Sequence, residues 1–259
     1  MNILFTICGR AGSKGFKNKN LKMFNGVPLV YYSLAAIELF SRENKDKYDI
    51  DVVVNTDSRE LIDITKKQRV IEINVINRGE SLAGDKVPKE TVIKDCLIRM
   101  TEKKNKTYDV VVDLDITSPL RTVHDIENAV NKKLSRDDTR VVFSATEARR
   151  NPYFNMVKEE DGYYVKAVRS AYTTRQESPL LYDMNASIYA YSPKAMLEHD
   201  DDATFFNDKC DMIIMKDTGI LDIDSEEDFE LMQVVAEYLV KSRNEYAEIK
   251  EMAKKLLAL

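Results

Sequence analysis

The chain has 259 residues, of which 44% are apolar and 32% are charged, with only eight glycines and six prolines. Its length suits one large domain, or one domain with an appendage, and its composition excludes a disordered, collagen-like or low-complexity protein. A formal net charge of −5 argues against a surface devoted to nucleic acid or to a membrane. No apolar stretch approaches the roughly 18 residues of a spanning helix. We therefore predict no nucleic-acid partner and no membrane partner.

Cysteine and histidine content narrows the possible chemistry. The three cysteines stand far apart, and no CxxC pair occurs. This usage predicts a cytoplasmic protein with reduced thiols. The two histidines lie in different segments, and this content disfavours a histidine-based zinc site and a Ser-His-Asp triad.

Apolar periodicity predicts alternating strands and helices through the first half of the chain. Continuous apolar runs typical of buried strands occupy residues 2–8, 48–57, 70–76, 108–115 and 140–145. Helical spacing of apolar residues occupies 28–40, 58–68, 88–104 and 122–134. Short connections and continuous rather than alternating apolar runs favour a parallel sheet covered by helices on both faces.

The alternation breaks at 150–192, where two strand-like runs follow one another without a helix between them. We interpret this segment as an inserted antiparallel arm. Residues 211–215 return to the sheet, and 225–240 form a capped amphipathic helix. The predicted fold is α/β, a doubly wound and mostly parallel sheet, in one domain spanning 1–259 with a small antiparallel insertion.

Sheets of this kind bind ligands in the loops at the carboxyl ends of their strands. The sequence therefore directs attention to five loops, at residues 9–22, 55–58, 77–89, 115–122 and 222–225.

The first of these loops combines glycines and cations. Glycines 9, 12 and 15 give GxxGxxG, which fits neither the dinucleotide fingerprint nor the P-loop. Five cations accompany them, and no acid precedes Glu38: Arg10, Lys14, Lys17, Lys19 and Lys22. The pattern predicts a loop that binds a triphosphate through charge-assisted contacts. A solvated basic loop is the alternative interpretation.

The last loop carries two carboxylates. Asp222 and Asp224 alternate in "LDIDSEEDF", and on a strand both would point to the same side. Paired carboxylates beside a polyphosphate loop predict a Mg²⁺ (or Mn²⁺) site. The alternative is that one aspartate only caps the following helix.

Two further segments carry polar residues with weaker signals. Thr117 and Ser118 in "DITSPLRT" either contact a ligand or shape the turn. Arg175 suits a substrate carboxylate and would equally suit an interface. Gln176 and Asn185 accompany it in the predicted arm.

Six stretches, in order, resemble the acylneuraminate cytidylyltransferase (CMP-sialic acid synthetase) family. They are "ICGRAGSKGFKNKNL", "NRGESLAGD", "DITSPLRT", "RNPYFN", "TTRQ…YDMNASIYAY" and "DIDSEEDF". The resemblance runs from about residue 3 to residue 240, and it is nearest to the branch that activates legionaminic acid. It implies the nucleotide-diphospho-sugar transferase variant of the Rossmann-like sheet, a homodimer, and a dimerisation arm.

The resemblance also implies an activity, in which CMP passes from CTP to the C2 hydroxyl of a nine-carbon α-keto sugar acid and pyrophosphate leaves. It implies the following roles: Arg10, Lys14 and Lys19 at the triphosphate; Gly12, Ser13 and Asn20 at the nucleotide; Arg78 at cytidine; Asp222 and Asp224 at Mg²⁺; Arg175, Gln176 and Asn185 at the sugar. Asp224, Arg10, Lys14 and Lys19 would be catalytic.

Three features depart from the family pattern, the first of them "GRAG" in the first loop, where "ARGG" is commoner. Asp115 stands where many of its members carry Gln, and Lys89 stands where Ser or Thr is frequent. The alternatives are a CMP-N-acetylneuraminate synthetase, a sugar-phosphate nucleotidyltransferase that uses GTP or UTP, and a non-catalytic nucleotide-binding module. The glycine spacing and the cations disfavour an NAD-dependent dehydrogenase.

Overall fold

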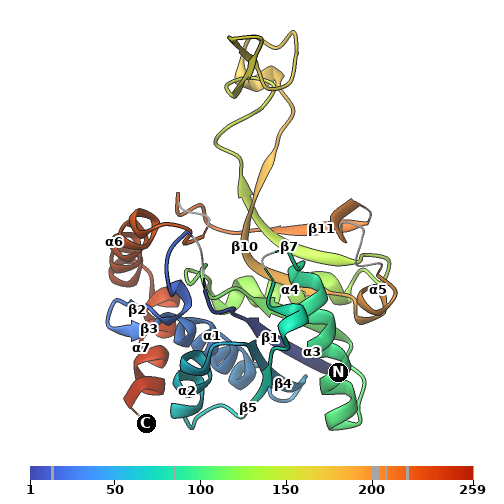
Figure 1. Ribbon diagram of the computed structural model, residues 1–259, viewed down its shortest axis with the longest axis vertical. Helices are drawn as coiled ribbons and strands as arrows, with labels where there is room; N and C mark the ends of the chain where they lie inside the picture. Colours follow the sequence, from blue (N-terminus) through green and yellow to red (C-terminus); the bar gives the residue numbers. More distant parts are fainter. Residues whose placement is uncertain (13–14, 85, 200–204, 208, 220–221, 259) are drawn as a thin grey trace.

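A seven-stranded sheet with helices on both faces forms the body of the molecule, and a long arm projects from it (Figure 1). The computed structural model describes residues 1–12, 15–84, 86–199, 205–207, 209–219 and 222–258. The strand order in the sheet is β11-β7-β10-β6-β1-β4-β5. No helix in these ranges combines the length and the apolar character that a membrane crossing needs.

The elements alternate through the first half of the chain, as the sequence predicts. The strands are β1 (Asn2–Cys8), β2 (Met23–Phe24), β3 (Val27–Pro28), β4 (Asp49–Thr56), β5 (Ile73–Asn77), β6 (Val110–Leu114), β7 (Val141–Glu147), β8 (Val157–Glu160), β9 (Tyr163–Lys166), β10 (Tyr182–Tyr191) and β11 (Cys210–Ile214). The helices are α1 (Leu29–Glu43), α2 (Arg59–Lys67), α3 (Lys89–Lys104), α4 (Val123–Leu134), α5 (Pro193–Leu197), α6 (Glu226–Ser242) and α7 (Asn244–Ala258), with 3-10 turns η1 (Lys19–Leu21), η2 (Glu80–Leu82), η3 (Arg175–Glu177) and η4 (Phe205–Asn207).

Strand β1 runs through the middle of the parallel region. Its residue Phe5 lies opposite Val52 of β4 on one side and Val112 of β6 on the other. Strands β4 and β5 are also parallel, as are β7 and β11, whereas β10 is antiparallel to both of its neighbours. The prediction of a mostly parallel doubly wound sheet is confirmed.

Two apolar layers cover the sheet. On one face, α1, α4, α6 and α7 bury one side of the strands around Phe5 and Phe40, whose rings meet edge to face at 5.4 Å. On the other face, α3 packs over Leu4, Val53 and Val111. Because both faces are buried, the central strands read as continuous apolar runs.

The arm is shorter than the predicted insertion. Residues 182–191, assigned by the sequence to the arm, form β10 and lie between β7 and β6 in the main sheet. The arm itself covers 148–181 and carries the small β8–β9 hairpin and η3. The sequence did not indicate that β10 lies inside the main sheet, because the strand carries polar residues. Asn185 and Ser187 are buried there among hydrogen-bond partners rather than among apolar side chains.

Candidate active site

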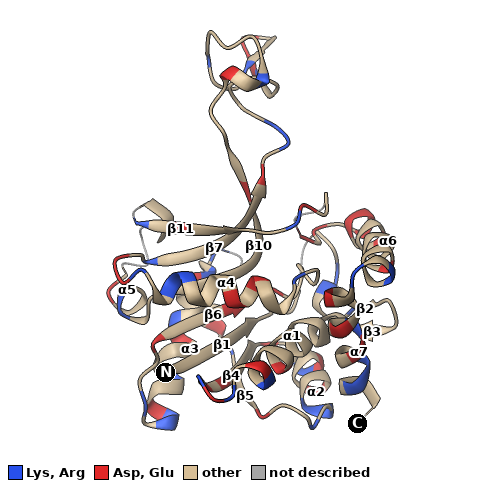
Figure 2. Cartoon of the chain, turned by 180° about the vertical axis from the view of Figure 1, so that it is seen from behind, with Lys and Arg blue, Asp and Glu red and all other residues tan. Residues whose placement is uncertain are grey.

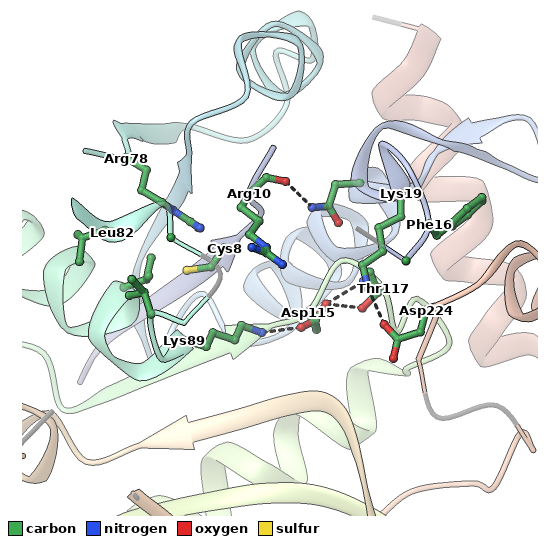
Figure 3. A pocket seen from close by; sticks show the side chains of 15 residues that line it. Cys8, Arg10, Phe16, Lys19, Arg78, Leu82, Lys89, Asp115, Thr117 and Asp224 are labelled. Carbon is green, nitrogen blue, oxygen red and sulfur yellow. Dashed lines mark hydrogen bonds and ion pairs between the residues drawn. The ribbon is translucent and has the colours of Figure 1, made fainter. Parts of the chain in front are cut away.

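A cavity of about 420 Å³ opens at the carboxyl edge of β1, β4, β5 and β6 (Figure 3). Its lining comes from the first loop, from the β5–α3 connection, from the β6–α4 loop and from the segment before α6. The lining residues are Cys8, Arg10, Gly15, Phe16, Lys19, Asn20, Arg78, Leu82, Gly84, Val87, Lys89, Val92, Asp115, Thr117 and Asp224. Four of the five loops that the sequence selects therefore meet here.

The first loop folds tightly over the end of β1. Gly9 N–H donates to the Asn55 carbonyl at 3.1 Å, and the Asn20 side-chain amide donates to the Arg10 carbonyl at 3.2 Å. A Cβ on Gly15 would lie only 3.0 Å from the Asp224 carbonyl oxygen. Glycine at this position lets the first loop lie directly against the segment before α6.

Lys19 joins these two segments through its ammonium group. The Nζ atom donates to the Ile223 carbonyl oxygen and to Asp224 Oδ1, both at 2.8 Å. The Asp224 side chain is 72% exposed and also lines the cavity, so its carboxylate is accessible to a bound ligand. A cation from the predicted triphosphate loop and a carboxylate from the predicted metal pair are thus direct neighbours.

Asp222 and Asp224 lie in a loop, whereas the sequence predicted a strand. Ile223 N–H donates to the Thr117 carbonyl at 3.0 Å, and this bond holds the segment on the β6–α4 loop. The aspartates do not cap α6, because Ser225 and Asp228 form its capping box. Burial, together with the carboxylates of Asp224 and Asp115, raises the pKa of Asp222 to about 6.

This carboxylate pair fits a divalent cation by the chemistry of its donors. Mg²⁺ prefers one or two carboxylates together with phosphate oxygens and water rather than a complete protein cage. Within the described ranges, no cluster of three or more His, Cys, Asp or Glu residues could hold a metal ion alone. Any ion here would therefore take part of its coordination from a bound polyphosphate.

Lys89 lies in the cavity wall between two carboxylates. Its Nζ atom is 2.6 Å from Asp113 Oδ2 and 2.6 Å from Asp115 Oδ2. Burial raises the pKa of Asp115, but the Lys89 ammonium and hydrogen bonds from Thr117 outweigh burial and lower that pKa. The sequence marked Lys89 and Asp115 only as departures from a family pattern, and it gave no sign that they pair.

Arg121 supports the β6–α4 loop from beneath. Its side chain is fully buried, and its guanidinium donates to Ser187 Oγ at 3.0 Å and to Ser33 Oγ at 2.8 Å. The same group donates to the carbonyl oxygens of Asp115 and Ser118. Burial lowers the pKa of Arg121 to about 10, so the group stays charged at neutral pH.

Arg78 occupies the opposite end of the cavity from Asp224 (Figure 3). Its Nε atom donates to Asn55 Oδ1 at 2.8 Å, and Nη2 donates to the Asn55 carbonyl at 2.9 Å. The guanidinium is thus fixed in direction by β4.

The predicted sugar-binding residues lie away from this cavity. Asn185 is buried in β10, where its Oδ1 accepts from Ser144 Oγ at 2.6 Å and its carbonyl accepts from Ser118 Oγ at 3.0 Å. Arg175 and Gln176 lie in η3 of the arm, and Arg175 Nη2 donates to the Ala148 carbonyl.

The remaining predicted residues belong to the first loop. Gly12 takes φ +70°, a conformation that suits glycine, and borders a small recess of about 70 Å³ that shares Arg10 and Asn20 with the cavity. Ser13 and Lys14 lie outside the described residues.

Comparison with known proteins decides the family. A family model described as "Cytidylyltransferase" matches residues 4–249. The chain belongs to the cytidylyltransferase family. As a cytidylyltransferase, it brings the glycine-rich and cation-rich loop and the acidic segment together at one cavity.

This cytidylyltransferase has several named relatives. Post-translational flagellin modification protein B of Campylobacter coli is 36% identical over 242 residues, which cover 93% of this chain and 96% of that protein. CMP-N,N'-diacetyllegionaminic acid synthase of Campylobacter jejuni is 35% identical with the same coverage. N-acylneuraminate cytidylyltransferase of Streptococcus agalactiae is 28% identical over 88% of this chain and 52% of its own length.

Solved structures of low identity share the fold of this cytidylyltransferase. CMP:2-keto-3-deoxy-manno-octonic acid synthetase in complex with CTP has a TM-score of 0.58 at 14% identity, over 92% of this chain and 99% of that one. The 4-diphosphocytidyl-2C-methyl-D-erythritol synthase of Anaerococcus prevotii has a TM-score of 0.60 at 15% identity, over 91% and 98%.

Proposed function

We propose that this enzyme transfers CMP from CTP to the C2 hydroxyl of a nonulosonic acid, a nine-carbon α-keto sugar acid, and releases pyrophosphate. The observation that carries the proposal is that Arg10 and Lys19 line the same cavity as Asp115 and Asp224, at the carboxyl edge of the sheet. A triphosphate and an acidic acceptor both need cations, and the carboxylates suit a cation bound to phosphate.

In the proposed reaction the acceptor C2 oxygen attacks the α-phosphorus in line. A C2–O–P bond forms, the bond between the α-phosphorus and the bridging oxygen breaks, and pyrophosphate leaves with the electron pair. The hydroxyl proton passes to solvent. Little covalent work falls on the protein, so positioning and neutralisation of charge should supply the rate enhancement.

Residues of the first loop take the nucleotide in this scheme. Arg10, Lys14 and Lys19 bind the triphosphate, Asn20 contacts the α-phosphate region, and Gly12 and Ser13 let the backbone approach. Arg78, fixed by Asn55, faces the cytidine end.

Asp222 and Asp224 would hold Mg²⁺ or Mn²⁺, which supplies charge neutralisation at the phosphates. Lys19, bonded to Asp224 and to the Ile223 carbonyl, keeps this acidic segment against the first loop. The ammonium and the carboxylate thereby lie side by side in the cavity wall.

For the acceptor, we propose legionaminic acid or its N,N'-diacetyl form, with N-acetylneuraminic acid as the alternative. Support comes from the 35% identity to the Campylobacter jejuni legionaminic acid enzyme. The sialic acid enzyme of Streptococcus agalactiae, at 28%, and a pseudaminic acid enzyme of Campylobacter jejuni, at 26%, are more distant, as is a second legionaminic acid enzyme, that of Legionella pneumophila, at 26%.

A pyrophosphate-release assay tests the reaction. With Mg²⁺ and CTP, we expect release with legionaminic acid or N-acetylneuraminic acid as acceptor and none with Kdo. With GTP or UTP in place of CTP, we expect no release. Release with GTP or UTP and a sugar phosphate, but with none of the α-keto acids, would contradict the proposal. Nucleotide binding without release in every combination would instead indicate a non-catalytic module.

We propose further that the enzyme is a homodimer joined through its arm. The arm exposes several large apolar side chains. They are Met156, Val157, Tyr163, Tyr164, Val168 and Leu180. Charged residues are interspersed along the arm (Figure 2). Tyr163 and Tyr164 are 76% and 75% exposed, which is typical of a contact surface rather than of a free hairpin. In a dimer, Arg175 and Gln176 would serve the acceptor in the partner's cavity.

Replacing both tyrosines, as Tyr163→Ser with Tyr164→Ser, should convert the dimer to a monomer in light scattering after size exclusion. Burial of two aromatic rings supplies much of the binding energy of an interface. Leu257→Ser is the control, because α7 lies at the end of the molecule opposite the arm (Figure 1). A wild-type monomer, or a double variant that stays dimeric, would contradict this arrangement.

A further inference from the structure

The Lys89 ammonium is held by two acids from neighbouring positions on β6 and its end. Asp113 is fully buried, and its other oxygen, Oδ1, accepts from Thr6 Oγ1 at 2.7 Å. Asp115 Oδ1 accepts from the Thr117 N–H at 2.9 Å and from Thr117 Oγ1 at 2.8 Å. Every partner in this cluster is itself anchored, so the ammonium has one defined position.

Both members of the Lys89–Asp115 pair keep capacity for a ligand. An ammonium has three N–H donors, and among the described residues two carboxylates engage Lys89. A carboxylate offers about four acceptor sites, and three bonds to described residues occupy Asp115. The Lys89 side chain is 29% exposed and that of Asp115 is 21% exposed, and both line the cavity.

A donor and an acceptor held side by side match a hydroxyl group, which accepts and donates at once. A phosphate or a carboxylate offers only acceptors and would meet the negative charges of Asp113 and Asp115. In Figure 3, the Lys89–Asp115 bond lies between Arg78 on one side and Lys19 with Asp224 on the other. A sugar ring between a base and a phosphate chain would occupy this region.

We propose that Lys89 and Asp115 form a pair that binds a sugar hydroxyl of one of the two reactants. The inference rests on the proposed function and deepens it. The hydroxyl belongs either to the ribose of CTP or to the acceptor, and the same chemistry recognises both. Arg121 donates hydrogen bonds to the Asp115 and Ser118 carbonyl oxygens and so holds Asp115 in its position at the cavity.

Asp115→Asn is the decisive variant. An asparagine side-chain oxygen can still accept from Thr117, and the ion pair between Lys89 and Asp113 stays intact, so the fold should be preserved. Binding of CTP, 2'-deoxy-CTP and 3'-deoxy-CTP to wild type and variant is measured by calorimetry without acceptor, and the KM for the acceptor is measured by pyrophosphate release.

If the pair binds a ribose hydroxyl, wild type should bind one of the two deoxynucleotides roughly 10- to 100-fold more weakly than CTP. Asp115→Asn should then bind CTP and that deoxynucleotide with nearly equal affinity. If the pair binds the acceptor, nucleotide affinities should stay unchanged while the acceptor KM rises by a similar factor. Asp63→Asn removes an exposed acid of α2 outside this cavity and should change neither quantity.

The proposal is overturned if Asp115→Asn folds and leaves both the deoxynucleotide preference and the acceptor KM unchanged. Should that variant unfold, Asp115→Glu retains the charge but displaces the carboxylate, and the same two readouts apply. Failure of the wild-type chain to bind CTP would overturn the proposed function and this assignment together. If wild type turns over CTP normally and Asp115→Asn behaves like wild type, only this assignment is overturned.

Discussion

Asp224→Ala should reduce pyrophosphate release by about 10³-fold and leave the folded state nearly as stable as wild type. The carboxylate is 72% exposed, and its structural partner is the Lys19 ammonium, so its removal costs little packing. Turnover should suffer because the site loses a ligand for a phosphate-bound cation, a contribution of several kcal/mol to the barrier. Initial rates at saturating CTP and thermal unfolding, measured on the same preparation, test both statements.

The neighbouring acid Glu227 supplies the control for this experiment. It lies exposed in the first turn of α6, and Glu227→Ala removes the same charge three residues away. We expect wild-type turnover from it. If Asp224→Ala loses its fold along with its activity, the aspartate is structural, and the metal assignment fails.

Arg121→Met should destabilise the protein by about 3–5 kcal/mol, the usual cost of breaking a buried charged network. The substitution keeps the bulk of the side chain but leaves the hydroxyls of Ser33 and Ser187 and two loop carbonyls without their donor. Unsatisfied polar groups in a fully buried position are costly. Chemical denaturation, monitored by circular dichroism, measures the change.

Arg42→Met is the matched control, because that guanidinium is 56% exposed and pairs with Glu38 on the same helix. It should change the free energy of unfolding by no more than about 0.5 kcal/mol. A loss below about 1 kcal/mol in Arg121→Met would show that water or rearrangement replaces its hydrogen bonds.

Much of the fold was predictable because each parallel strand carries its own signal. The burial of β1, from Ile3 to Ile7 on both faces, requires the continuous apolar run that identifies it. Strand β10 is strand-like in sequence but lacks a continuous apolar run, since Asn185 and Ser187 hydrogen-bond to side chains from elsewhere in the chain. Its antiparallel place beside β6 depends on contacts that no local pattern encodes.

The same distinction applies to the site. Arg10, Lys19, Asn20, Arg78 and Asp224 line one cavity, because parallel strands deliver their following loops to one edge. The strand predicted around Asp224 is wrong, because that segment is held to the β6–α4 loop through Ile223 and Thr117.

The cluster of Lys89 with Asp113 and Asp115 was beyond sequence reasoning, because it joins a helix start to a strand 24 residues further along the chain. Nothing in either segment alone shows that these side chains meet, since the contact depends on how α3 packs against the sheet.

The two ends of the arm meet in a single hydrogen bond, from Ala148 N–H to the Leu181 carbonyl at 3.0 Å. Strands β7 and β10 are already antiparallel neighbours there, so a short turn could join Glu147 to Tyr182 without moving either strand. The arm could therefore be excised or exchanged while the strands of the main sheet keep their order and pairing. The proposed acceptor contacts of Arg175 and Gln176 would travel with the arm, whereas the cavity at the carboxyl edge would stay with the sheet.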